Sequence, residues 1–219
     1  MAVLRRASED LPKNAVILDT NEAIRFQWNY IFDYQPKYEM WPFRYGLPML
    51  SIFAGASTMY INSCFRQGYR LKQYGRVASY LPLTVAPTFL GFILQRKCVT
   101  DEILLQTVPC PLCLYSRAVG IQLAAGILYP MGLAPIGNIM IALRYATVRI
   151  PEIKDFKGHL TLFKKVTKPL ISRLPYLVCA HMITAVFITN REMKAFTCFY
   201  DKLLREEEAI TEMSKSYES

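Results

Sequence analysis

The stretch AVGIQLAAGILYPMGLAPIGNIMIAL, residues 118–143, contains 26 consecutive positions without a charged side chain. A helix needs about 20 mainly apolar residues to cross the hydrocarbon core of a bilayer. Helices of soluble proteins instead carry a polar face along their length. Pro130 and Pro135 lie past the middle of the stretch and predict a kink, because proline lacks a backbone N–H. Residues 117–142 are therefore predicted to form a kinked transmembrane helix.

Three further stretches without a charge occur in the chain, at residues 45–65, 77–95 and 174–190. Four stretches of spanning length predict an all-α, multi-pass membrane protein with four transmembrane helices. Their expected bounds are about 46–65, 77–95, 117–142 and 173–190. A soluble all-α core is the rival interpretation, and it would require the polar helix faces that these stretches lack.

The composition of the 219 residues excludes two other classes of protein. Hydrophobic residues make up 53% of the chain, which is too high for intrinsic disorder. Six cysteines are too few for a small disulfide scaffold of this length. The chain then divides into an aromatic and charged segment at 1–44, the membrane domain at 45–190 and an amphipathic tail at 191–219. The alternation of Trp28, Tyr30, Phe32 and Tyr34 predicts a strand or an interfacial segment.

The net charge of +9 is concentrated between the predicted spans. Two loops carry eleven basic and two acidic side chains, so together they account for the whole net charge. The basic residues are Arg66, Arg70, Lys72, Arg76, Arg144, Arg149, Lys154, Lys157, Lys164, Lys165 and Lys168. The positive-inside rule places loops 66–76 and 144–168 on the cytoplasmic or matrix side, and the termini and loop 96–117 on the other side.

This charge distribution also bears on the partners. Nucleic acid is not predicted as a partner, because binding it would require one basic face with stacking aromatics. Here apolar spans separate the basic residues. The lipid bilayer is the expected environment, and anionic lipid is a candidate ligand of the basic loops.

A CxxC pair, Cys110 and Cys113, lies beside the start of the third predicted span. A helix N-terminus and a nearby arginine, here Arg117, both favour the thiolate form of such a cysteine. On the predicted side of the membrane a disulfide could persist. A structural disulfide, a pair of reduced thiols and a redox pair all remain open. A metal site is not predicted, because a lone CxxC supplies only half of the ligands that zinc requires.

The segment PCPLCLYSR (109–117) resembles the first cysteine motif of DsbB-like quinone-linked thiol oxidases. That family consists of four-span bundles in which the arginine four residues after the second cysteine contacts the quinone. The resemblance would give this role to Arg117. The family also requires a second cysteine pair between its third and fourth spans, and residues 144–173 contain no cysteine.

A longer resemblance begins at the same cysteines. The pattern consists of Cys110, Cys113, Arg117, Gly126, Leu128, Tyr129, Pro130, Leu133, Ala134, Asn138, Ala142, Arg144 and Tyr145. It is similar, without gaps, to the transmembrane protein 126 family of the mitochondrial inner membrane, and Lys168-Pro169 matches the start of that family's last span. The CxxC pair favours the A-type over the B-type paralogue, or a single ancestral-type member.

The resemblance implies a membrane-embedded assembly factor for the membrane arm of respiratory complex I. The expected partners are complex I membrane-arm subunits and other assembly factors, including the MCIA assembly complex. No enzymatic activity and no cofactor are expected. Loops 66–76 and 144–168 would then face the matrix, and the termini and loop 96–117 the intermembrane space. An accessory subunit of mature complex I and a thiol–quinone oxidoreductase are the alternative functions.

Three residues of the spans are expected to act in packing or at the membrane edge. Two interpretations stay open for Asn138 and Arg144, which are polar groups near the membrane edge. They either contribute to binding a partner, or Asn138 bonds within the bundle and Arg144 reaches to the interface. His181, in the middle of the fourth predicted span, is interpreted as a hydrogen-bonded bundle residue rather than a proton relay.

Overall fold

The computed structural model describes residues 18–108, 110–148 and 156–218. Every regular element in these ranges is a helix, which confirms the predicted all-α class. The elements are α1 (Thr20–Asp33), the π-helical turn η2 (Pro42–Gly46), α2 (Leu47–Gly68), α3 (Arg76–Gln95), the π-helical turn η3 (Arg96–Thr100), α4 (Asp101–Leu105), α5 (Pro111–Leu123), the π-helical turn η4 (Ala124–Leu128), α6 (Tyr129–Tyr145), α7 (Phe156–Ile171) and α8 (Leu174–Glu218). Residues 1–17 of the predicted N-terminal segment and 149–155 of the second basic loop lie outside the described residues.

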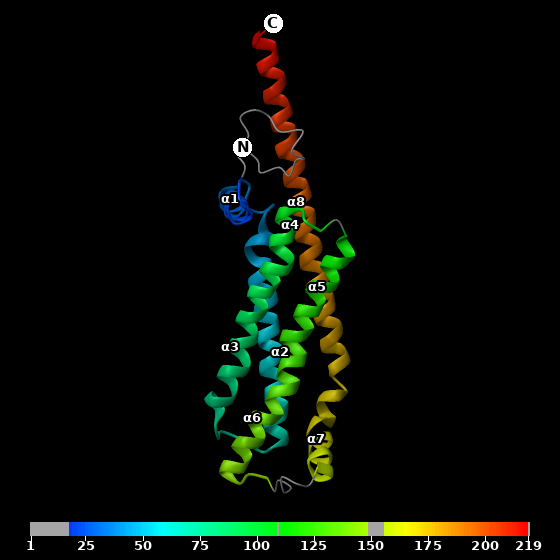
Figure 1. Ribbon diagram of the computed structural model, residues 1–219. Helices are drawn as coiled ribbons and strands as arrows, with labels where there is room; N and C mark the ends of the chain where they lie inside the picture. Colours follow the sequence, from blue (N-terminus) through cyan, green and yellow to red (C-terminus); the bar gives the residue numbers. More distant parts are fainter. Residues whose placement is uncertain (1–17, 109, 149–155, 219) are drawn as a thin grey trace.

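The long helices run side by side as an elongated bundle (Figure 1). α2 contacts α3, α6, α7 and α8, and α5 packs along α8. Residues 69–75, the end of α6 and α7 gather at one end of the bundle, which we call the basic end. α1, α4 and the turn between α4 and α5 gather at the opposite end, which we call the cysteine end. The described parts of both basic loops therefore lie at the same end of the bundle.

Among the described residues, two helices are long and apolar enough to cross a membrane, at Arg76–Leu105 and Pro111–Tyr145. A third crossing is obtained if Leu160–Ile171 and Leu174–Glu206, which meet at a bend of 56°, count as one broken span. The predicted count of four is therefore not confirmed by length and hydropathy. The predicted first span forms α2, whose buried polar residues include Ser51, Ser57, Thr58 and Asn62. These side chains lower the hydropathy of α2.

The interior position of α2 explains why it tolerates polar residues. A Cβ atom at Gly55 would overlap Thr88 of α3, so the two helix backbones approach closely there. Ser51 donates a hydrogen bond to Leu47 O at 2.9 Å, and Thr58 donates one to Gly55 O at 2.7 Å. These hydroxyls bond to the backbone of their own helix, which small polar residues do in packed membrane helices.

The strand interpretation of the N-terminal aromatic alternation is wrong. Residues Thr20–Asp33 form α1, and the N–H of Asp19 donates to Glu22 Oε2 at 3.3 Å at its start. Trp28 and Ile31, three residues apart on one helix face, are buried, whereas Phe32 is exposed. Trp28 Nε1 donates to Asp101 Oδ1 of α4 at 3.1 Å. This tertiary contact anchors a helix whose sequence pattern alone was ambiguous.

The predicted third span is one helical path from α5 through η4 to α6. The π-helical turn Ala124–Leu128 ends two residues before Pro130. Proline removes a backbone donor, and a wider turn before it accommodates the lost hydrogen bond. The irregularity predicted from the prolines is thus located in a π-helical turn, just before the first of them.

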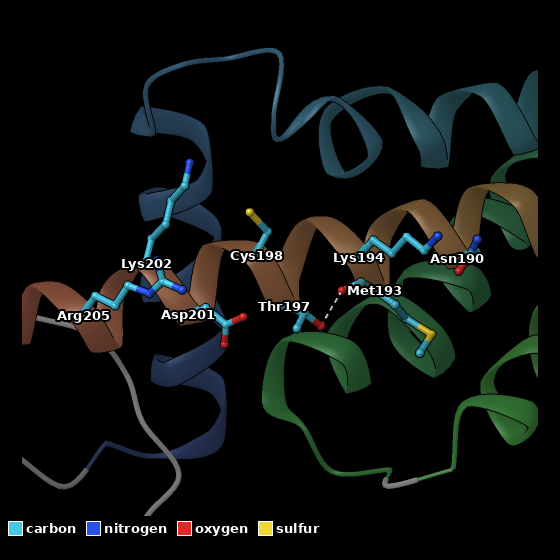
Figure 2. Close-up of a pocket in the computed structure, with 8 residues that line it drawn as sticks. All are labelled: Asn190, Met193, Lys194, Thr197, Cys198, Asp201, Lys202 and Arg205. Carbon is cyan, nitrogen blue, oxygen red and sulfur yellow. Dashed lines mark hydrogen bonds between the residues drawn. The ribbon is translucent and has the colours of Figure 1, made fainter.

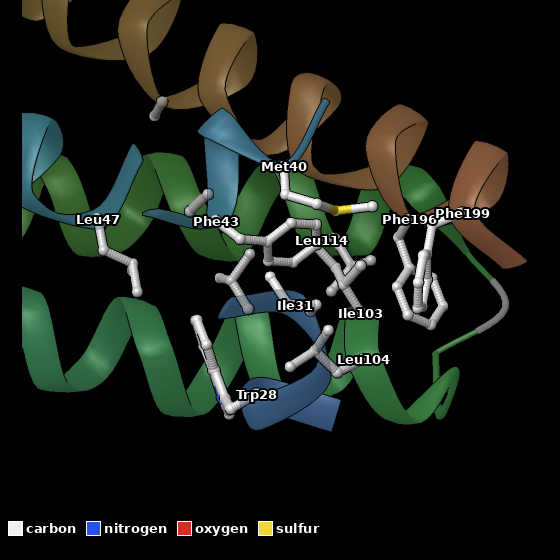
Figure 3. Packing of buried hydrophobic residues seen from close by; sticks show 13 residues of the cluster. Trp28, Ile31, Met40, Phe43, Leu47, Ile103, Leu104, Leu114, Phe196 and Phe199 are labelled. Atoms are coloured by element: carbon white, nitrogen blue, oxygen red, sulfur yellow. The ribbon is translucent and has the colours of Figure 1, made fainter. Parts of the chain in front are cut away.

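Two apolar clusters hold the ends of the bundle. At the cysteine end, side chains from α1, η2, α4, α5 and α8 point toward one another (Figure 3). They include Trp28, Ile31, Phe43, Leu114 and Phe196. At the basic end, a second cluster joins α2 to α3, α6 and α7. Because Phe196 belongs to α8, the predicted tail at 191–219 begins as a packed continuation of the same helix rather than as a separate element.

Candidate functional site

The sequence-predicted site residues do not converge on one place. All of them lie on the path from the α4–α5 turn through α6, which runs the length of the bundle (Figure 1). Cys110, Cys113 and Arg117 lie at the cysteine end. Gly126, Tyr129, Pro130 and Asn138 lie along the middle of the path, and Arg144 and Tyr145 lie at the basic end. The motif thus forms three local groups, each with its own neighbours.

The cysteine pair starts α5. Cys110 precedes Pro111 at the first helical position, and the N–H of Cys113 donates to Cys110 O at 3.2 Å. Both cysteines are free thiols, and Cys113 is exposed. A hydrogen bond from the Cys113 side chain lowers the pKa of the Cys110 thiol, and the Cys113 and Leu112 backbone N–H groups add to this effect. The arrangement favours a thiolate at Cys110 with a second thiol beside it.

Arg117 is paired within the chain. Its Nη1 lies 3.0 Å from Glu102 Oε1, with 46% and 30% of the two side chains exposed. Glu102 also accepts a hydrogen bond from Thr107 Oγ1 at 3.3 Å. An ion pair with this exposure contributes only about 0–1 kcal/mol. Arg117 therefore links α5 to α4 across the turn that carries the cysteine pair.

Gly126 provides the closest helix contact of the motif. A Cβ atom there would overlap the ring of His181 on α8. His181 is fully buried, its Nε2 lies 2.8 Å from Ser57 Oγ, and its ring centroid lies 4.6 Å from that of Phe53. Three helical segments, α2, η4 and α8, therefore meet at one imidazole. This contact supports the interpretation of His181 as a hydrogen-bonded bundle residue.

Asn138 also bonds inside the bundle, which is one of the two interpretations that its sequence position left open. Its Nδ2 donates to Asn62 Oδ1 at 2.9 Å, and both residues are fully buried. Pro130 is buried, and Tyr129 packs against the apolar cluster of the basic end. The polar atoms in the middle of α6 therefore join it to α2 and are turned away from the surrounding bilayer.

Arg144 and Tyr145 end α6 at the basic end. The ring of Tyr145 stacks on that of Tyr74 at a centroid distance of 4.7 Å. The guanidinium of Arg144 lies 6.0 Å from the Tyr145 ring centroid, and both side chains are exposed. An arginine next to stacked tyrosines is typical of a membrane–water interface.

Arg66 has a structural role that the sequence analysis missed, because it was counted there as a loop charge. The side chain is buried and makes four hydrogen bonds. They reach Ser79 Oγ at 2.6 Å, Tyr74 O at 2.8 Å, Lys72 O at 3.0 Å and Gly75 O at 3.3 Å. The signal in the sequence is an arginine at the end of a span, before a short loop whose carbonyl groups have no helical partners.

Glu192 is a second residue that the sequence analysis missed. It is fully buried on α8, and its Oε2 accepts a hydrogen bond from Thr100 Oγ1 of η3 at 3.3 Å. A Cβ atom at Gly46 would lie 3.3 Å from its other carboxylate oxygen. The available signal was one acidic residue on a helix face that otherwise carries Ile188, Phe196 and Phe199. Glu192 ties α8 to η3 and η2 at the cysteine end.

An open groove of about 490 Å³ follows α8 near the cysteine end (Figure 2). It is lined by Asn190, Met193, Lys194, Thr197, Cys198, Asp201, Lys202 and Arg205. Lys202 Nζ lies 2.7 Å from Glu39 Oε2, and that hydrogen bond lowers the pKa of the Glu39 carboxyl.

Across residues 18–108, 110–148 and 156–218, no cluster of three His, Cys, Asp or Glu residues could hold a metal ion.

Comparison with known proteins matches the chain to one family. The family model described as Transmembrane protein 126 matches residues 22–207. A Drosophila melanogaster protein named Transmembrane protein 126 is 32% identical over 196 residues, which cover 89% of this chain and 88% of the relative. Transmembrane protein 126A of Mus musculus is 25% identical over 150 residues, covering 68% and 74%. No solved structure matches the chain.

Proposed function

Because the chain belongs to the transmembrane protein 126 family, we propose that it is a membrane-embedded assembly factor for the membrane arm of mitochondrial respiratory complex I. It acts as a scaffold in the inner membrane and not as an enzyme. Its partners are membrane-arm subunits and other assembly factors. The family resemblance over residues 110–145 implies this role. The match of the family model to most of the chain supports the resemblance.

The structural observation that best supports a scaffold is the use of the motif residues in internal contacts. Gly126 packs against His181, Asn138 bonds to Asn62, and Arg117 pairs with Glu102. A catalytic motif would bring its polar groups together in one cleft. These contacts instead maintain the shape of the bundle, and they leave its outer apolar faces available for lipid or partner helices.

The outer face of α3 is one apolar surface of this kind. Val77, Leu81, Phe89 and Ile93 are all more than half exposed. α6 adds exposed apolar side chains at Ile136 and others toward its end. Transmembrane helices associate through such faces by close packing, and a membrane-arm subunit has apolar helices of the same kind to offer.

We further propose that the bundle crosses the membrane four times, with α2 as the first crossing. α2 has 22 residues, enough to cross a bilayer core, and its buried polar side chains face its neighbours rather than lipid. The basic end lies on the matrix side and the cysteine end in the intermembrane space, in accordance with the positive-inside rule.

Affinity capture tests the proposed function. The full-length chain, carrying a C-terminal tag, would be expressed in mitochondria and captured in a mild detergent. We expect complex I membrane-arm subunits and assembly factors to be enriched over a control capture with an unrelated multi-pass inner-membrane protein. Absence of all of them would overturn the proposal. Co-migration with fully assembled complex I on native gels would instead identify an accessory subunit.

A thiol–quinone oxidoreductase is the second candidate, favoured by the lowered pKa of Cys110 beside Cys113. The C110S/C113S variant separates the two functions. We expect complex I assembly to stay within about twofold of the wild type, because Cys113 is exposed, Cys110 is only partly buried, and substitutions at such positions change stability by less than about 0.5 kcal/mol. Assembly is measured on native gels in cells that lack the endogenous protein.

The matched control for this variant is C179S/C198S, which replaces two exposed cysteines on α8. Quinone reduction driven by a dithiol would be measured for the wild type and both variants. Loss of this activity in C110S/C113S alone, together with loss of assembly, would favour the oxidoreductase over the scaffold.

A further inference from the structure

α7 is an amphipathic helix that is attached to the basic end by its apolar face. Val166 and Leu170 are buried, and the ring of Phe163 stacks on Phe65 of α2 at a centroid distance of 6.3 Å. A Cβ atom at Gly68 would overlap the Val166 side chain, so α7 lies directly against the end of α2. The docked face fixes the orientation of the opposite face.

The opposite face of α7 carries exposed lysines. They are Lys157, Lys164, Lys165 and Lys168. A lysine in the hydrocarbon core is strongly unfavourable, so α7 cannot serve as the first half of a membrane crossing. The bend of 56° between α7 and α8 agrees with this placement, because it turns α7 away from the line of the α8 crossing. α7 therefore lies at the level of the lipid headgroups.

Apolar and aromatic side chains on and next to α7 support the same level in the membrane. Leu160 and Ile171 are exposed although they lie on the same helix as the lysines. Tyr176, five residues past the end of α7, is 78% exposed. Lysines above exposed apolar groups, with a tyrosine alongside, are the pattern of an interfacial helix.

The two ends of the bundle differ in how their cations are neutralised. At the cysteine end, Arg96 lies near Asp101, Arg117 pairs with Glu102, and Lys202 pairs with Glu39. At the basic end, the sequence has no acidic residue within 69–76 or 156–173. Exposed cations there include Arg70 and Lys72 on the loop after α2, and Arg76 at the first position of α3. Within these two described segments no acidic side chain balances the positive charge, which is therefore available to an external anion.

We propose that α7 and residues 69–76 form a binding surface for anionic phospholipids of the bilayer that surrounds the bundle. The lysine ammonium groups contact the lipid phosphates, while Leu160 and Ile171 contact the upper part of the acyl chains. Charge complementarity and the headgroup level of α7 together select a lipid over a soluble anion. The inference requires only that the chain is a membrane protein, so it does not rest on the complex I role.

Lipid retention after purification tests the inference. The full-length protein would be reconstituted in vesicles of phosphatidylcholine with 20 mol% cardiolipin, re-extracted in mild detergent and analysed for bound lipid by mass spectrometry. We expect the wild type to retain cardiolipin above its share in the vesicles. The K164Q/K165Q/K168Q variant should retain about three- to tenfold less, because each cation near an anionic surface adds to the attraction.

The matched control is K97Q/K194Q/R205Q, which removes three exposed cations near the cysteine end. It should retain cardiolipin within twofold of the wild type. Equal losses in both triple variants, or no enrichment in the wild type, would overturn the inference. So would unchanged lipid retention accompanied by loss of a captured protein partner, which would identify an acidic protein as the occupant.

Folding of the lysine variant is monitored by helical circular dichroism and by thermal unfolding. Both should match the wild type, because the three lysines are exposed and α7 is attached by its buried face. If the triple variant failed to fold, the single variants K164Q, K165Q and K168Q would replace it. A graded loss of cardiolipin across them supports the inference, and retention equal to wild type in all three contradicts it.

Discussion

The G126A variant is expected to unfold with a free energy about 2 kcal/mol below that of the wild type. The added methyl group overlaps the His181 ring, which cannot move aside freely. Ser57 holds the ring by a hydrogen bond of 2.8 Å, and Phe53 packs against it. Three helical segments would have to separate to admit one carbon atom. Unfolding by sodium dodecyl sulfate in mixed micelles, followed by circular dichroism, measures the change.

Gly120, which lies on α5 and precedes the η4 turn that carries Gly126, is the matched control for Gly126. No atom lies within 4 Å of a Cβ built at Gly120. G120A should therefore leave the bundle unchanged or stabilise it by about 0.5–1 kcal/mol, because alanine favours a helix over glycine. The opposite signs of the two Gly-to-Ala changes are the test. Equal changes in unfolding free energy in G126A and G120A would show that the contact with His181 does not cause the destabilisation of G126A.

A double-mutant cycle connects the cost at Gly126 to His181. H181A alone removes the ring and leaves a cavity, so it should also destabilise the bundle. In the H181A background the methyl group of G126A has room. The two changes together should cost at least 1 kcal/mol less than the sum of the single costs, roughly the coupling expected of residues in contact. If the losses of unfolding free energy of G126A and H181A simply add in the double variant, the contact between Gly126 and His181 is contradicted.

The R66M variant is expected to lose about 3 kcal/mol of unfolding free energy, because it removes charge-assisted hydrogen bonds and leaves carbonyl groups unpaired. Methionine retains an apolar stem but has no donor for Ser79 or for the three carbonyls. R66K should recover only part of the loss, because one ammonium cannot reproduce the fork of a guanidinium.

The loop after α2 gives a second measurement of the same change. In R66M the loop should open, and trypsin should cleave after Arg70 and Lys72 faster than in the wild type. R76M is the control, since Arg76 is exposed and its side chain donates a long hydrogen bond of 3.5 Å to Gln73 Oε1. It should change stability by less than about 0.5 kcal/mol. A similar loss in both variants would mean that loop charge, and not the Arg66 contacts, stabilises this end.

The positions of the long helices could be predicted because the signal is local. A run without charges specifies a buried or membrane helix wherever it folds. The number of crossings could not be settled in the same way, since α2 combines spanning length with polar residues that only its neighbours satisfy. The aromatic alternation near Trp28 suggested a strand, and a contact with Asp101, 73 residues away, accompanies the helix that forms instead.

The motif residues could be found from the sequence, but their partners could not. Asn138 bonds to a residue 76 positions away, and His181 bonds to one 124 positions away. Spacing along one helix says nothing about which distant residue faces it. Arg66 illustrates the same limit, because a cation beside a span looks identical whether it faces solvent or the carbonyls of a loop. Only the packed structure distinguishes these cases.

α8 remains one helix for 45 residues, from beside α7 in the basic half of the bundle to beyond its cysteine end (Figure 1). At a rise of 1.5 Å per residue this corresponds to about 68 Å, more than twice the thickness of a bilayer core of about 30 Å. Contacts of His181 with Ser57 and of Glu192 with Thr100 hold α8 against its neighbours inside the bundle. Because the helix continues unbroken past these contacts, its C-terminal part projects from the cysteine end in a direction that the bundle sets (Figure 1).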